Sequence, residues 1–150
     1  MGEDLLEDLT LVDDPDHDTP GHLLSFGMQL HDFVVRHPGL PAYLQTLFPR
    51  GAGGERLLTD EVAALRRRGY APDAALVLCG AVASLAIGLA AAADAQREHA
   101  DGLGEQQQQV LDRLLDHAEL GGPHRMLPDV VHHDYVRLVL TAAVRGLAAA

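Results

Sequence analysis

An uncharged stretch of twenty residues constrains this chain more than any other feature. It runs from Ala74 to Ala93 (AALVLCGAVASLAIGLAAAA) and is bounded by Asp73 and Asp94. As an α-helix it would be about 30 Å long, which matches the hydrocarbon core of a bilayer. A helix that is apolar on every side is otherwise buried by other helices. The stretch is rich in Ala and Gly, so a partner backbone could approach it closely.

We favour the buried helix over a membrane span. The rest of the chain is acidic and amphipathic, with no second apolar stretch of this length and no signal-peptide pattern at its start. Pro72 is expected to begin the helix, which becomes polar after Asp94 and ends in a loop at residues 101–104. The sequence therefore predicts a central or subunit-interface helix and no association with a membrane.

Length and composition indicate one domain, residues 1–150, large enough to bury an apolar core. The net charge is −11, and the chain contains 11 Arg and no Lys. Because nucleic-acid binding depends on cations that neutralise phosphates, we expect no nucleic acid to bind this chain itself. Cys79 lies inside the apolar stretch, where burial would raise its thiol pKa. A single cysteine and an acidic balance favour a reducing, cytoplasmic location.

Apolar residues recur at helical spacing in further segments that Pro and Gly separate. We expect a short helix at 3–12, and longer ones at 19–36, 41–48, 58–69, 110–118 and 128–149. Thr19 is the expected N-cap of the second of these helices, with Pro20 at its first position. Residues 50–54 (RGAGG) are expected to be a flexible loop. No segment shows the two-residue alternation of a strand, so the predicted fold class is all-α.

The order of these segments resembles the C-terminal regulatory domain of tetracycline-repressor (TetR) family transcription regulators. The matching phrases are Arg36-His37-Pro38-Gly39, a helix ending in Arg-Arg-Arg-Gly69-Tyr70, the long helix with Ser84-Leu-Ala-Ile-Gly88, and a closing Arg145-Gly146-Leu147. The resemblance extends from about Leu5 to Leu147. It implies a TetR C-terminal-like helical bundle of about six to seven helices, which would dimerise through a four-helix bundle.

The resemblance also implies a function: an effector-binding and dimerisation domain of a transcription regulator, holding a hydrophobic small molecule between its helices. In the family, the long helix and the closing helix pack against their two-fold mates, so a homodimer is expected. The family's pocket maps onto Phe26, Leu30, Tyr43, Thr46, Leu47, Leu58, Glu61, Leu76, Cys79, Gly80, Ala83 and Ser84. Val110, Leu114 and His117 would reach in from the partner subunit.

The chain departs from the family in three places. Members that hold tetracycline with magnesium use a His and a Glu, where this chain has Tyr43 and, approximately, Ala92. A hard divalent cation needs oxygen ligands or a fixed imidazole, so we expect neither a metal nor a cofactor. The family's three-helix DNA-binding head should precede residue 1 and is absent from the sequence, so the chain is either a trimmed regulator or a natural headless relative.

This third departure leaves a second class of function open. A headless relative could serve as a biosynthetic enzyme, such as a cyclase or isomerase, or as a protein that sequesters a polyketide-like product. His31, Tyr43 and Glu61 would then be the candidate acid/base groups. Glu61 could equally be an exposed helix carboxylate, and His22, in the first turn of its helix, is expected to face solvent.

Overall fold

The computed structural model of this protein describes the backbone of residues 5–117 and 132–149, and their side chains except at 98–112, 114–117 and 132. Over these residues the chain forms helices joined by turns, without a strand, which confirms the all-α prediction. The elements are η1 (Leu6–Asp8), α2 (Thr19–Val35), α3 (Leu40–Leu47), α4 (Ala52–Arg67), α5 (Pro72–His117) and α8 (His132–Ala149).

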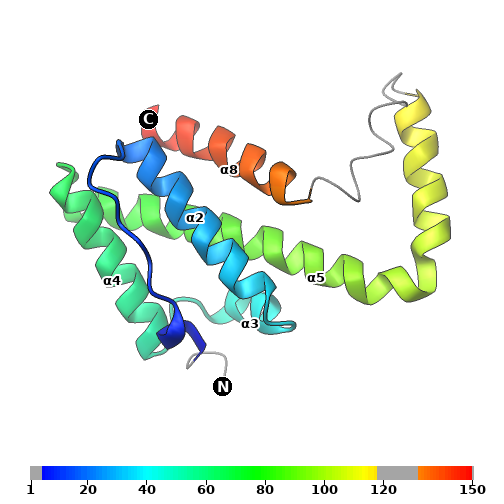
Figure 1. Cartoon of the computed structure of the whole chain (residues 1–150), viewed down its shortest axis with the longest axis horizontal. Helices are drawn as coiled ribbons and strands as arrows, with labels where there is room; N and C mark the ends of the chain where they lie inside the picture. Colours follow the sequence, from blue (N-terminus) through cyan, green and yellow to red (C-terminus); the bar gives the residue numbers. More distant parts are fainter. Residues whose placement is uncertain (1–4, 118–131, 150) are drawn as a thin grey trace.

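Helix α5 is the element on which the others pack. Figure 1 shows α2 lying across α5, with α3 and α4 on one side and α8 on the other, and α5 contacts all four. One side of α5 enters the common core through Cys79, Val82, Ala83, Ala86 and Ile87, each at most 1% exposed. The predicted central position of this helix therefore holds for the described residues.

The apolar part of α5, Pro72–Arg97, is also long and apolar enough by composition to cross a membrane. Of the most apolar 18-residue segment within it, 39% is buried inside the structure. The core helix of a folded domain has the same length and composition, so this property does not distinguish a membrane span from a core helix.

Asp94 explains why the uncharged stretch ends where it does. Its carboxylate is buried, accepts a hydrogen bond from the backbone N–H of Gly39 (3.1 Å), and pairs with Arg97 one turn later. Gly39 has a φ of 87° and precedes the first residue of α3, a conformation that favours glycine. The first charge after the stretch thus fixes the α2–α3 turn to α5.

Two predictions about the N-terminal part of the chain differ from the structure. Asp18, and not Thr19, caps α2: its side chain accepts a hydrogen bond from Gly21 N at 2.8 Å, with Thr19 and Pro20 already in the helix. The expected helix at 3–12 is reduced to the single turn of η1. Residues that follow η1 run extended over α2 and α4, because tertiary contacts outweigh a short helical pattern.

The glycine-rich loop predicted at 50–54 is wrong in its second half. Helix α4 begins at Ala52 and includes Gly53 and Gly54. A Cβ added at Gly54 would lie 2.6 Å from the Pro49 carbonyl oxygen, so this glycine permits a close approach of two backbones. Gly54 therefore serves packing and not flexibility.

The C-terminal half of α5 also differs from the prediction. The expected loop at 101–104 is helical, and the helix predicted at 110–118 is part of α5 as far as His117. Two glycines cost a helix about 1 kcal/mol each relative to Ala, which flanking Ala, Glu and Gln can offset. Figure 1 shows the last part of α5 standing away from the packed helices. Residues 118 and 128–131 of the predicted helices lie outside the described residues.

We predict opposite effects for two identical substitutions in helices. Gly54→Ala should lower the free energy of unfolding by about 1–3 kcal/mol, since the added methyl meets fixed backbone. Gly146→Ala in α8, where nothing lies within 4 Å, should raise it by up to about 1 kcal/mol through helix propensity. Urea denaturation followed by circular dichroism measures both. Equal effects of the two substitutions would contradict the packing role of Gly54.

Candidate functional site

The segment between η1 and α2, residues 9–18, forms with η1 a strap over α2 and α4. Two leucines of the strap, Leu6 and Leu9, have buried side chains. One guanidinium nitrogen of Arg56 on α4 donates to the carbonyl oxygens of Leu6, Glu7 and Leu9 at 3.0–3.2 Å. On α2, the Gln29 amide accepts from Val12 N (2.9 Å) and donates to Val12 O (3.2 Å). The strap is therefore held by both helices.

A buried histidine joins the strap to these two helices. His22 on α2 is 2% exposed, and its Nε2 lies 2.8 Å from Oε2 of Glu61 on α4, which is 3% exposed. Its Nδ1 lies 3.2 Å from Oδ1 of Asp13 on the strap, within ion-pair distance but not aligned as a hydrogen bond. The expectation that His22 faces solvent is wrong, and so is the alternative that Glu61 is an exposed carboxylate. Two carboxylates facing one imidazole form a compact link between three segments.

Asp13 is anchored in turn by the basic end of α4. Its two oxygens accept from Arg68 (2.9 Å) and Arg67 (2.8 Å). Arg68 also donates to the carbonyls of Asp14 (2.9 Å) and Ala64 (3.1 Å). Hydrogen bonds from Arg68 first and Arg67 second lower the pKa of Asp13 from 3.8 to about 2. The only arginine cluster of the sequence therefore serves mainly to hold the strap.

This network changes the interpretation of the candidate acid/base groups. Glu61 is engaged by His22, while His31 on α2 lies with Nδ1 3.0 Å from Asp32, which also meets His133 of α8 at 3.2 Å. Tyr43 is half-buried on α3. Glu61 and His31 thus have different partners: the Glu61–His22 pair joins α4 to α2, while Asp32, the neighbour of His31 on α2, reaches α8 through His133.

The structure distributes the predicted ligand-binding residues over several environments. Phe26, Leu30, Cys79 and Ala83 are buried in the core, and Glu61 is buried against His22. Tyr43, Leu47 and Gly80 are half-buried, and Thr46 and Ser84 are exposed. The side chains of Val110, Leu114 and His117 lie outside the described residues. The remaining two, Leu58 and Leu76, line a groove.

This groove, the α4–α5 groove, has a volume of about 270 Å³ and is open to solvent. Its lining is Leu58, Thr59, Val62, Ala63 and Arg66 from one side of α4, and Leu76 from the second turn of α5. Sequence reasoning missed Thr59, Val62, Ala63 and Arg66. Their spacing along one helical face could have indicated them, but only the position of α5 shows which face is covered.

A second surface feature runs along the side of α5 opposite the core. Val77, at 67% exposure, begins a row in which steps of four and three residues alternate. The row consists of Val77, Ala81, Ser84, Gly88, Ala91 and Ala95. On α8 the same alternation joins Tyr135 (53% exposed), Leu138 (68% exposed), Ala142, Arg145 and Ala149. We call these two rows the α5 seam and the α8 seam.

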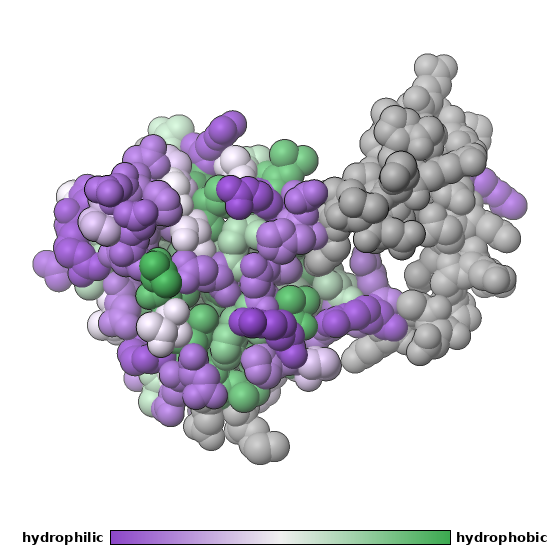
Figure 2. All heavy atoms as spheres, in the orientation of Figure 1, coloured by the Kyte–Doolittle hydropathy of each residue, from purple (hydrophilic) through white to green (hydrophobic). Residues whose placement is uncertain are grey.

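The face of the molecule that carries the strap looks different. Figure 2 shows that hydrophilic residues cover much of it, interrupted by small hydrophobic patches. Among the described residues, no group of three or more His, Cys, Asp or Glu side chains is arranged to hold a metal ion. Cys79 is a buried thiol whose pKa burial, and secondarily the charge of Glu61, raise to about 12, which confirms its predicted shift.

No family model, curated protein or solved structure matches this chain. The TetR resemblance therefore stays a prediction, and the function has to be argued from the geometry above.

We predict that the strap weakens in acid because of Asp13. Its pKa is lower in the folded state, so the stabilisation is complete above pH about 4 and is lost as the pH falls towards 2. Because Asp13 is 29% exposed, screening reduces the expected loss to about 1–2 kcal/mol. The difference in unfolding free energy between wild type and Asp13→Asn should shrink over this range. Asp16→Asn, an exposed change on the same strap, is the control, and the same trend in both variants would refute the assignment.

Proposed function

We propose that this chain is the effector-binding and dimerisation domain of a TetR-like regulator, which binds a hydrophobic small molecule. The observation that carries the proposal is the pair of exposed seams on α5 and α8. In the proposed dimer these seams meet their two-fold copies and form a four-helix bundle.

The spacing of the seams supports this arrangement. Steps that alternate between three and four residues average 3.5, the repeat that keeps one side of a helix facing a partner helix. The α5 seam contains mostly Ala, Gly and Ser, and nothing lies within 4 Å of a Cβ added at Gly88. Small side chains allow two helices to approach closely, so α5 could pack against its copy over several turns.

The position of the seams supports it too. The opposite sides of the two helices are buried in their own core, through Val82 and Ala86 of α5 and Val136 and Leu140 of α8. Both helices contact α2 and each other, so both seams lie on the side away from α2. A contiguous exposed apolar surface commonly marks an interface with another protein.

Effector binding would act on this dimer by population shift. A ligand that binds one packing of the helices more tightly than another favours that packing, and in an intact repressor this changes the separation of the DNA-binding heads. The alternative of a biosynthetic enzyme depends on His31, Tyr43 and Glu61. Among the described residues, the engagement of Glu61 by His22 favours a structural use of this carboxylate.

We predict that Ser84→Glu converts a dimer into a monomer. The added carboxylate would lie at the centre of the α5 seam, opposite its own copy, where burial and like-charge repulsion both oppose association. Sedimentation equilibrium should show at least a tenfold weaker dimer with unchanged helix content. Gln45→Glu, exposed on α3, adds the same charge elsewhere and should leave the dimer intact. A wild-type protein that is monomeric at micromolar concentration would refute the proposal.

We also predict stabilisation by a hydrophobic effector. At a ligand concentration about one hundred times Kd, linkage raises the unfolding free energy by about 2.7 kcal/mol, or Tm by about 5–10 °C for a domain of this size. A thermal-shift screen of apolar natural products, including polyketides, measures this. If no member of a broad library shifts Tm, the sensor function fails while the dimer can still stand.

A further inference from the structure

We infer that the α4–α5 groove binds an amphipathic anion, with an apolar body on Leu58, Val62 and Leu76 and a carboxylate on the Arg66 guanidinium. The inference rests on the proposed function in taking the occupant to be the effector. It goes further by naming the effector's chemical class and the residue that would select it.

The apolar part of the groove is already formed. Leu58 and Val62 are half-buried one turn apart on α4, and Leu76 of α5 is 50% exposed at the same groove. Ala63 leaves room between them because its side chain is small. The volume of about 270 Å³ lies near the lower limit of small-molecule sites, about 300–1,000 Å³. A short aliphatic or single-ring body therefore suits it better than a large polycyclic one.

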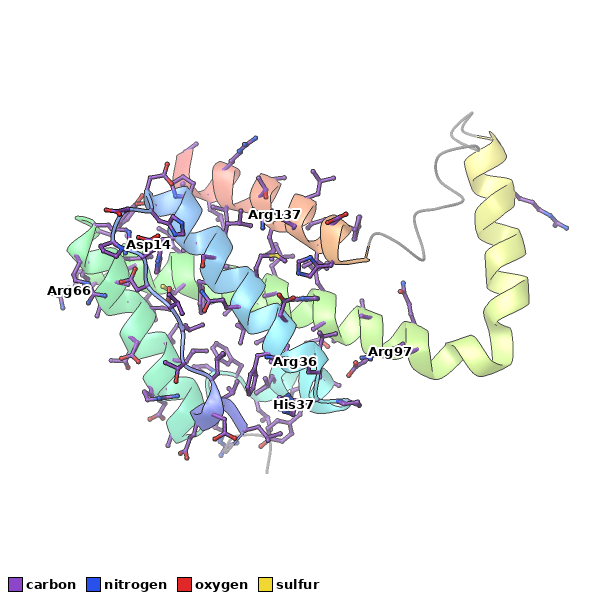
Figure 3. The ribbon with its side chains drawn as sticks, in the orientation of Figure 1. Asp14, Arg36, His37, Arg66, Arg97 and Arg137 are labelled. Atoms are coloured by element: carbon purple, nitrogen blue, oxygen red, sulfur yellow. The ribbon has the colours of Figure 1, made fainter. Side chains whose placement is uncertain are left out.

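The cation at its edge is available. Arg67 and Arg68 both bind Asp13, whereas the Arg66 side chain has no hydrogen bond or ion pair with any residue that the structure describes. Figure 3 shows Arg66 at the outer edge of α4, turned towards solvent. Since a guanidinium can donate two parallel hydrogen bonds to a carboxylate, it is well suited to an anionic head group.

The charged residue of the groove lining, Arg66, favours an anion over a cation. The chain as a whole is strongly acidic, so an accessible arginine beside an apolar surface is a local exception. Asp73 is the closest acidic residue before Leu76 in the chain. Its carboxylate accepts a hydrogen bond from Ala74 N at 2.9 Å and is therefore already engaged at the start of α5. Thr59 adds a hydroxyl to the groove, which could hydrogen-bond a second oxygen of the ligand.

Octanoate and octanol test the inference, because they share the apolar chain and differ in the charge of the head group. Titrations of the full chain, followed by amide chemical shifts in two-dimensional NMR, give an affinity and a location for each ligand. We expect octanoate to bind about tenfold more tightly than octanol, as for a charge-assisted hydrogen bond, with shifts centred on Ala63 and Leu76.

Three variants separate the two parts of the site. Arg66→Gln should reduce octanoate affinity about tenfold and leave octanol unchanged. Arg137→Gln removes an equal charge from the outside of α8 and should change neither affinity (Figure 3). Val62→Asn should weaken both ligands. Equal binding of the two ligands, shifts elsewhere, or an Arg66→Gln protein that binds octanoate normally would each overturn the inference.

Failure of this inference can be distinguished from failure of the proposed function. If wild type is a dimer that other apolar compounds stabilise but Arg66→Gln has no effect on octanoate, the groove assignment fails alone. If the protein binds octanoate through Arg66 but is monomeric, the groove stands and the regulator proposal fails.

Discussion

Burial of one side of α5 is the interaction on which the rest of the structure depends. Every other long helix packs on this side or on a neighbour that does, so the common core forms around Cys79, Val82 and Ala86. Few large aromatic side chains take part, since aromatic residues make up only 4% of the chain. Small residues instead let the helices approach closely, as at Gly27 of α2, where an added Cβ would lie 3.0 Å from Val82 of α5 and 3.3 Å from Leu140 of α8. The fold depends on close backbone packing more than on bulky side chains.

Polar groups then determine the positions of the strap and the α2–α3 turn, which the apolar core does not orient. Hydrophobic burial has no direction, so it does not by itself decide how the strap and the α2–α3 turn are placed. Asp94 binds the turn through Gly39, and His22 binds the strap through Asp13 while holding Glu61. Asp94, His22 and Glu61 are buried, and leaving any of them without its partner would carry the desolvation cost of an unpaired polar group. They specify one arrangement among several that an apolar core would tolerate.

The same distribution places the two proposed functional regions on different parts of the surface. The strap and α4 occupy one side, with the groove and Arg66 at its edge, while the seams of α5 and α8 face the other way. A ligand in the groove would contact the start of α5, whose later turns carry the proposed dimer seam. One rigid helix would therefore connect effector and interface, a contiguous connection of the kind that coupling between sites can use.

The sequence by itself determined the all-α class, the position of the central helix and the burial of Cys79, because periodicity and an uncharged stretch are local properties. Tertiary structure alone decided that Gly54 serves a close backbone contact and that His22 and Glu61 are buried together. It also decided that, among the described residues, Arg67 and Arg68 pair with Asp13 while the Arg66 side chain has no partner. The physical reason is that each of these facts depends on contacts outside a single helical pattern. Pro49, before the start of α4, lies against Gly54; His22 of α2 lies against Glu61 of α4; and Asp13 of the strap lies at the end of α4. A single helical pattern indicates which side is apolar, but it contains no information on which segment will cover that side.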